Sequence, residues 1–408
     1  MQPLFFGGGS GMADATNTTT AQGFRADRLE QLPPYLFVEI DRKKREAIEA
    51  GRDVIDFGVG DPDLPTPDFI VERLSEAAGD SANHRYAPSV GTIEFRQAVA
   101  AFFAKRYGVD LGPKSEVIAL IGAKEGIGHL PLAVINPGDV VIVPEPGYPV
   151  YVSGAVFAGG ECHVVPLSAE RSWLPDLSTI PDDIRERAKI LWLNYPNNPT
   201  GAVAPISFFE EAVAFAREND LLVAQDAAYN EVYFEDPPAS ILQVDGAKDV
   251  AIEFHSLSKT FNMTGWRLAF AVGNAEVVSA LAAVKSNLDS GAFGAIQQAG
   301  IAALEGIDRS ELSDLIGTYR RRRDAVVNGL LRAGWEIDVP DATLYVWARC
   351  PGGKDSMTVA TRLLDEANVV VIPGSGFGTA GEGFVRLALT VPEDLTLEAM
   401  ERIARVSW

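Results

Sequence analysis

The chain has 408 residues, 47% of them hydrophobic, with only two cysteines and a formal net charge of −21. This length supplies a large globular core, while two distant cysteines and four unpaired histidines argue against a disulfide framework and a metal site. The negative charge disfavours nucleic acid, and the absence of a long apolar run or a secretory signal leads us to expect no membrane contact and a cytoplasmic location.

The first part of the chain predicts a leader and an arm. Residues 1–24 are rich in glycine and threonine, a composition that cannot bury enough surface to offset its ordering entropy, so we expect a flexible leader. Residues 25–63 contain an expected helix at 38–50 and a turn-rich end, and we interpret them as an arm that reaches the functional site. Beyond them, Tyr86 opens a loop between two expected helices, where it serves either core packing or a ligand.

From residue 117 onward, apolar strands alternate with helices, which predicts an α/β protein with a mainly parallel seven-stranded sheet between helices. Ligands of such sheets bind beyond the carboxyl ends of the strands. The expected strands span residues 117–121, 140–143, 162–166, 190–193, 221–224, 250–254 and 268–272.

The C-terminal third predicts a second, smaller α/β domain. Helices are expected at 275–287, 295–304, 310–332 and 357–368, and strands at 335–339, 344–347, 369–372 and 384–389. We therefore divide the chain into a large domain at 64–300 and a C-terminal small domain at 301–408, with 25–63 as the arm and part of the small domain. The run of four arginines at 320–323 is interpreted as a solvated helix face.

Polar groups follow several of these strands. The glycine-rich turn 122–126, which contains Lys124, joins a strand to a helix and is either an anion site or a plain turn. Tyr148 could cover a planar ligand or simply pack. Asn198 could donate a hydrogen bond, although turn chemistry alone explains its loop. Asp226, at the end of an apolar strand, needs a partner such as a protonated pyridine nitrogen.

The loop at 255–267 is pinned between two apolar strands and contains Lys259. Hydroxyls at Ser256, Ser258 and Thr260 surround this lysine, and Arg267 follows eight residues later. An amine that forms a Schiff base and a cluster that binds a phosphate both suit pyridoxal phosphate. A solvated lysine in a surface turn is the alternative.

Two features of the last strands complete the set. Arg386 lies in an otherwise apolar strand, where it binds an anionic ligand or forms a structural salt bridge. The glycine-rich segment 374–378 lacks the spacing of a nucleotide loop, so a turn is favoured.

In their order along the chain, these motifs resemble class I/II aminotransferases of fold type I. The resemblance covers residues 25 to 408. Within that group, the segments at 32–37, 60–67, 124–127, 255–267 and 286–291 are similar to LL-diaminopimelate aminotransferases.

This resemblance implies a homodimer with shared active sites, which uses pyridoxal 5′-phosphate to move an amino group from an amino acid to a 2-oxo acid. Lys259, Asp226 and Tyr229 would be the catalytic residues, and Tyr86 would come from the neighbouring subunit. The implied cofactor-binding residues are Ala123, Lys124, Tyr148, Asn198, Asp226, Tyr229, Ser256, Ser258, Lys259, Arg267 and Tyr86. The implied substrate-binding residues are Arg386, Tyr35, Gly60 and Asn198.

The substrate implied by the closer resemblance is LL-diaminopimelate, with 2-oxoglutarate as acceptor, in lysine biosynthesis. Two positions depart from the expected pattern: Ala123 replaces a serine of the phosphate turn, and Ala295 replaces an asparagine that contacts cofactor and substrate. The alternatives are an aminotransferase for aspartate, alanine or another amino acid, a lyase that uses the same cofactor, and a catalytically idle binding protein.

Overall fold

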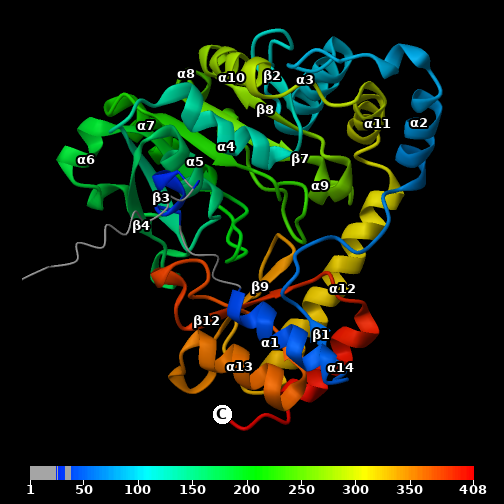
Figure 1. Cartoon of the computed structure of the whole chain (residues 1–408). Helices are drawn as coiled ribbons and strands as arrows, with labels where there is room; N and C mark the ends of the chain where they lie inside the picture. Colours follow the sequence, from blue (N-terminus) through cyan, green and yellow to red (C-terminus); the bar gives the residue numbers. More distant parts are fainter. Residues whose placement is uncertain (1–23, 25, 33–37) are drawn as a thin grey trace, which may run out of the picture.

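The computed structural model describes residues 24, 26–32 and 38–408. Tyr35 and the expected leader, apart from Phe24, lie outside the described residues. Figure 1 shows the middle of the chain around a large sheet in the upper part of the molecule, while segments from both ends of the chain lie together in the lower part. Within the described ranges, no helix has the length and apolar character that a membrane crossing requires.

The large sheet has seven strands in the order β2-β8-β7-β6-β5-β3-β4. Only β8 runs antiparallel to its neighbours, so the prediction of a mainly parallel seven-stranded sheet is confirmed. The strands are β2 (Val117–Leu120), β3 (Val140–Glu145), β4 (Glu161–Pro166), β5 (Ala188–Asn194), β6 (Leu222–Asp226), β7 (Ala251–Ser256) and β8 (Ala269–Gly273).

Helices cover both faces of this sheet. Successive side chains of a strand point to opposite sides, so each apolar strand contributes to a core on either face. In β2, Val117 and Ala119 pack into one core cluster while Ile118 and Leu120 pack into another. The helices on the Ile118 face are α4 (Ala123–Val134), α5 (Val150–Ala158) and α10 (Ala275–Leu288). The opposite face is covered by α3 (Ile93–Tyr107), α7 (Ile206–Glu218) and α11 (Gly294–Glu305), and α2 (Asp68–Ala78) packs on α11.

Local sequence signals set the ends of helices, as α3 shows. Thr92 caps α3 by accepting a hydrogen bond from the amide of Phe95, and Gly108 ends that helix in the left-handed conformation. The shortest helices are α6 (Asp182–Arg187), α8 (Ala247–Val250) and α9 (Leu257–Thr260).

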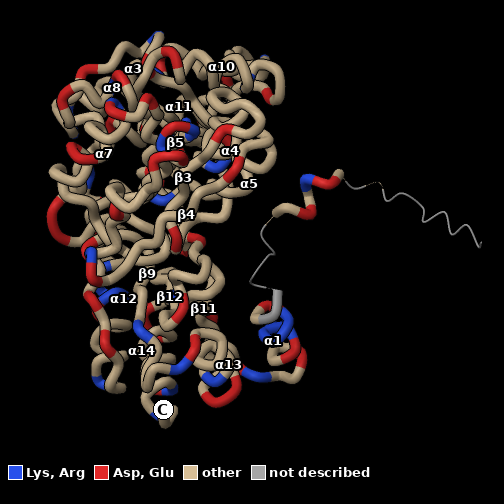
Figure 2. The backbone as a smooth tube through the Cα atoms, turned by 90° about the vertical axis from the view of Figure 1, so that its left-hand side faces the viewer, with Lys and Arg blue, Asp and Glu red and all other residues tan. Residues whose placement is uncertain are grey.

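The lower part of the molecule has its own core and two small sheets. Figure 2 shows its three-stranded sheet between the large sheet and the C-terminal helices. The strands are β1 (Ile55–Asp56) paired with β10 (Val369–Val370), and β11 (Ile372–Pro373), β12 (Phe384–Ala388) and β9 (Tyr345–Arg349) in one antiparallel sheet. The helices are α1 (Val38–Glu49), α12 (Ser310–Arg332), α13 (Ser356–Ala367) and α14 (Glu393–Ile403).

Two predicted strands of this part are wrong in extent. Residues 335–339 form no strand, and Ile337 makes only an isolated bridge to Ala348. The single strand expected at 369–372 is divided between β10 and β11, which belong to different sheets. The apolar pattern marked burial correctly at 369–372, but at 335–339 only Trp335 is buried and Val339 is exposed. Hydrogen-bond pairing depends on neighbours that are distant in sequence.

The interpretation of the arginine run as a solvated face is wrong for two of its four members. Arg320 and Arg321 are exposed, but Arg322 and Arg323 are buried. Arg322 forms a bidentate pair with Asp63, with distances of 2.7 and 2.9 Å between nitrogen and oxygen atoms. This pair ties the end of the arm to α12, and a buried guanidinium requires such a partner.

Candidate active site

A cavity of about 1210 Å³ lies beyond the carboxyl ends of β5, β6 and β7 and also contacts β9 and β12. Strand ends of a parallel sheet meet at one edge, which is why side chains from distant segments converge here. Twelve of the predicted site residues line it: Gly60, Ala123, Lys124, Tyr148, Asn198, Asp226, Tyr229, Ser256, Ser258, Lys259, Arg267 and Arg386.

Lys259 is held in the cavity by the elements on either side of it. It lies in α9, directly after β7, and the antiparallel pairing of Ser256 with Ala269 fixes both ends of its loop. Ser256 caps α9 by accepting a hydrogen bond from the amide of Ser258 at 3.3 Å. The Nζ atom of Lys259 donates to the carbonyl of Gly60 at 3.0 Å. The lysine is therefore directed into the cavity, and the alternative of a solvated surface lysine does not describe it.

Asp226 is a buried carboxylate at the end of β6. Its Oδ2 atom accepts a hydrogen bond from the hydroxyl of Tyr151 at 2.8 Å, and its Oδ1 atom accepts one from the amide of Ala228 at 3.2 Å. Burial raises the pKa of Asp226 to about 6, and the bond from Tyr151 opposes that rise. A cationic nitrogen in the cavity would favour the ionised carboxylate, so the site suits a protonated ring.

The turn between β2 and α4 has the features of an anion site. Gly122 has φ +78°, and a Cβ atom there would lie 2.0 Å from the Nη2 atom of Arg267. Ala123 begins α4, so free amides of its first turn accompany that guanidinium. The hydroxyl of Ser258 is buried without a hydrogen-bond partner among the described residues. These donors fit a phosphate group.

Arg386 reaches the cavity from β12. Its Nη1 atom donates to Oδ1 of Asn198 at 3.0 Å, and its Nη2 atom donates to the carbonyl of Gly58 at 2.9 Å. The guanidinium stacks on Tyr345 and Phe377, with distances of 4.3 and 4.9 Å to the ring centroids. Within the described ranges Arg386 has no carboxylate partner, so the salt-bridge alternative is not what the structure contains. The cation can bind a carboxylate ligand.

Three further tyrosines surround the cavity floor. Tyr148 lines the cavity and lies edge-on to Tyr151, with ring centroids 5.8 Å apart. Burial raises the pKa of Tyr148 to about 12, so its hydroxyl stays neutral at physiological pH. The hydroxyls of Tyr229 and Tyr345 share a hydrogen bond of 2.9 Å. Both hydroxyls can donate to and accept from polar groups of a ligand.

Among the residues that the sequence analysis missed, three contact predicted site residues. Tyr151 bonds to Asp226, Tyr345 bonds to Tyr229, and Phe377 lies in the segment interpreted as a turn. The sequence contained only a weak signal for the tyrosines, because a tyrosine buried in an apolar helix or strand needs a partner for its hydroxyl.

Tyr86 is not brought to this cavity. It is 92% exposed and is absent from the cavity lining. Ala295 is fully buried within α11 and is absent from the cavity lining. Ala123 does line the cavity, and its backbone keeps the amide that a serine would also supply.

The sequence model of the family described as "Aminotransferase class I and II" matches residues 52–403. The chain is 54% identical to an LL-diaminopimelate aminotransferase of Aquifex aeolicus, over 93% of this chain and 98% of the relative. It is 53% identical to one of Syntrophobacter fumaroxidans, over 94% and 99% of the two chains.

Solved structures agree with this likeness. Substrate-bound BacF of Bacillus subtilis matches with a TM-score of 0.90 and 38% identity, over 95% of this chain and 98% of that one. A single mutant of Thermus thermophilus aspartate aminotransferase matches with a TM-score of 0.88 and 32% identity, over 94% and 99%.

The fold and the cavity define an enzyme of fold type I that depends on pyridoxal 5′-phosphate. The chain belongs to the class I and II aminotransferase family. It is a transaminase, and its substrates are amino acids and 2-oxo acids.

Proposed function

We propose that this aminotransferase transfers the amino group of LL-diaminopimelate to 2-oxoglutarate, in lysine biosynthesis. The observation that carries the proposal is the identity of 53 to 54% over almost the whole chain to relatives that have this activity in their names. The cavity of about 1210 Å³ is consistent with it, because sites for one small ligand usually occupy about 300–1,000 Å³ and this site must hold a cofactor and a long diamino diacid.

Most of the proposed cofactor site comes from the large sheet and its loops. Lys259 would bind the cofactor through its amine, and Asp226 would pair with the ring nitrogen. Tyr148 would cover the ring, while Asn198 and Tyr229 would bond to its phenolic oxygen. The residues proposed to hold the phosphate are Ala123, Lys124, Ser256, Ser258 and Arg267.

Catalysis depends on where these residues place charge and protons. When bound, the cofactor supplies an electron sink for the charge that develops at the substrate Cα. Arg386 would hold the α-carboxylate in its guanidinium fork, next to Asn198 and Tyr345. The amine of Lys259 would then remove the proton from Cα and return it later in the reaction. Asp226 in its ionised form would keep the ring nitrogen protonated throughout.

We also propose a homodimer in which Tyr86 contributes to the cavity of the neighbouring subunit. Its exposure of 92% and its absence from the cavity of its own chain support this assignment. Leu288 and Phe293 are also large exposed apolar residues, at 60% and 41%. Burying such side chains favours association.

The division into a large domain at 64–300 and a small domain at 25–63 and 301–408 remains a proposal. It is supported by the separate core cluster that unites α1, α13 and α14 with β1 and β9 to β12. On this division, Gly60 and Arg386, which line the cavity, would belong to the small domain, and the site would lie between the two domains. The cytoplasmic location and the substrate contact of Tyr35 stay predictions.

Absorbance spectroscopy of the purified enzyme tests the substrate assignment. LL-diaminopimelate should bleach the visible band of the bound cofactor, and 2-oxoglutarate should restore it. The DD isomer is the matched control and should leave the band unchanged. Bleaching by aspartate or alanine but not by LL-diaminopimelate would replace the proposed donor, and release of ammonia without an acceptor would indicate a lyase.

A further inference from the structure

Lys285 is a fully buried lysine that the mechanism does not use. It lies on α10, and its Nζ atom is 3.0 Å from each carboxylate oxygen of Glu125 and 3.1 Å from Oδ1 of Asp289. An ammonium group is costly to bury unless it is paired in this way. We call these residues, together with His129, the Lys285 cluster.

On one side, the Lys285 cluster holds the turn assigned to the phosphate. Glu125 lies in the first turn of α4, and its Oε2 atom accepts a hydrogen bond from the amide of Ile121 at 2.8 Å. The amide of Glu125 donates in turn to the carbonyl of Gly122 at 3.2 Å. The Glu125 carboxylate therefore links the end of β2 to the start of α4, across the residues whose amides face the anion.

On the other side, the cluster holds the segment that follows α10. The amide of Asp289 donates to the carbonyl of Lys285 at 2.9 Å. Two residues later, a Cβ atom at Gly291 would lie 2.3 Å from the carbonyl oxygen of Pro88 and 2.7 Å from that of Ala87. The segment is thus packed directly against the loop that carries Tyr86.

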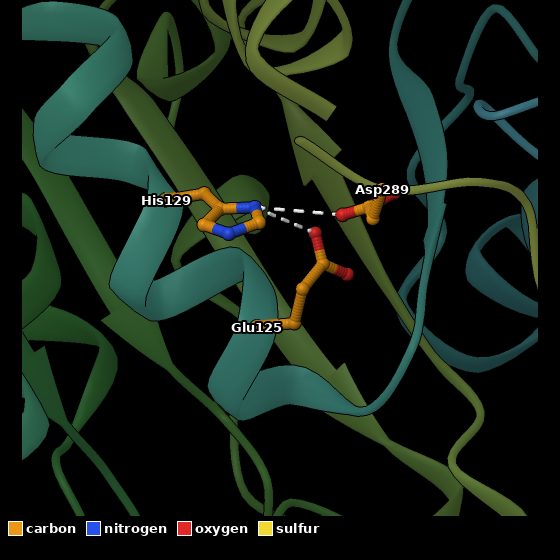
Figure 3. A group of neighbouring side chains, drawn as sticks. All are labelled: Glu125, His129 and Asp289. Atoms are coloured by element: carbon orange, nitrogen blue, oxygen red, sulfur yellow. Dashed lines mark ion pairs between the residues drawn. The ribbon is translucent and has the colours of Figure 1, made fainter. Parts of the chain in front are cut away.

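His129 completes the cluster without making it a metal site. Figure 3 shows its ring facing both carboxylates, with Nδ1 3.0 Å from Oε1 of Glu125 and 3.6 Å from Oδ2 of Asp289. Glu125, His129 and Asp289 are close enough together to hold a metal ion. However, the ammonium of Lys285 already bonds to both carboxylates, and it supplies the positive charge that a metal would bring.

We propose that Lys285 is a positioning residue for the cofactor phosphate. Through Glu125 it fixes the turn at residues 121–124, and through Asp289 it connects that turn to the loop of Tyr86. The proposal rests on the assignment of this turn to the phosphate. Loss of the ammonium would leave two unpaired carboxylates, and that of Glu125, which lines the cavity, would carry the same sign of charge as the phosphate proposed to bind there.

The test compares two forms of the cofactor on the apoenzyme, pyridoxal 5′-phosphate and pyridoxal, which lacks the phosphate. Dissociation constants are measured by absorbance or by quenching of protein fluorescence. In Lys285→Met, affinity for the phosphorylated form should fall roughly tenfold or more, as for other outer partners of ligand-binding groups. Affinity for pyridoxal should change by less than about twofold.

Two further variants separate positioning from a general loss of structure. Lys248→Met is the matched control, because Lys248 forms a 3.1 Å ion pair with Glu116 at the other end of β2, and it should leave both affinities unchanged. In Glu125→Gln combined with Lys285→Met, the glutamine can still accept from Ile121 while one unpaired charge is removed. This double variant should recover affinity for the phosphorylated form to within about threefold of the wild type.

Equal losses for the two cofactor forms, or no loss for either, would overturn the role of Lys285. A wild-type enzyme that binds both forms equally would instead refute the phosphate assignment itself. If Lys285→Met does not fold, Glu125→Leu is measured in the same way, because it removes the carboxylate through which Lys285 would act on the turn, and it should show the same selective loss.

Discussion

Replacing Tyr151 with phenylalanine should make cofactor binding more sensitive to acid. The hydroxyl of Tyr151 donates to Asp226 at 2.8 Å in a fully buried environment, and a hydrogen bond to an ionised acceptor contributes about 1.5–3 kcal/mol. At 1.36 kcal/mol per pKa unit, its loss should raise the pKa of Asp226 by about 1–2 pH units. In the wild type that pKa is about 6. The variant carboxylate would therefore be largely protonated near neutral pH and could not pair with a protonated ring nitrogen.

The assay is the dissociation constant of pyridoxal 5′-phosphate from the apoenzyme between pH 5 and 9. The break in its logarithm against pH reports the pKa of the free enzyme, and it should move upward in Tyr151→Phe. Tyr148→Phe is the matched control, because it removes a hydroxyl from the same cavity without removing a bond to Asp226. An unchanged break in Tyr151→Phe, or an equal shift in the control, would refute the reasoning.

Three other predictions concern stability, substrate and cofactor. Because burial raises the pKa of Asp226 to about 6, its ionisation opposes folding above pH 4. Asp226→Asn should therefore make the apoenzyme more stable at pH 8 by up to about 3 kcal/mol, as measured by urea titration. This gain in stability should disappear below pH 4. An equal gain at pH 3.5 and at pH 8 would show that ionisation of Asp226 is not its cause. Arg386→Lys should raise KM for the amino donor roughly 10- to 100-fold through loss of the bidentate contact, and steady-state kinetics in which only kcat changes would count against that role. Gly122 has φ +78°, and an added Cβ atom there would lie 2.0 Å from Nη2 of Arg267, whereas an added Cβ atom at Gly128 would meet its nearest atom at 3.9 Å. Gly122→Ala should therefore weaken cofactor binding more than Gly128→Ala. Equal affinities in equilibrium titrations would exclude the clash.

Much of the site could be predicted because its parts are set locally. A turn rich in glycine after an apolar strand led to the prediction of an anion site, and in the structure Gly122 of that turn has positive φ while Ala123 and Lys124 line the cavity. Lys259 follows β7 and Asp226 ends β6, as the apolar runs predicted. In a mainly parallel sheet such strand ends meet at one edge, so knowing the strands was enough to bring these residues together.

Other parts depended on contacts between residues far apart in sequence. Tyr151 and Asp226 are separated by 75 positions, and Lys285 and Glu125 by 160. The periodicity of a helix or strand indicates which face is buried but not which partner that face meets. For that reason the sequence could not reveal which hydroxyl or ammonium satisfies each carboxylate.

The sequence by itself determined where the seven strands of the large sheet lie along the chain and the positions of the lysine loop and the glycine turn, because each is encoded within a few neighbouring residues. The tertiary structure decided the order of those strands in the sheet. The tertiary structure alone decided that Arg322 is buried against Asp63, 259 positions away, and that residues 335–339 form no strand. It also decided that Tyr345 meets Tyr229. The physical reason is the same in each case: a buried polar group or a free strand edge is satisfied by whichever group the fold brings to it.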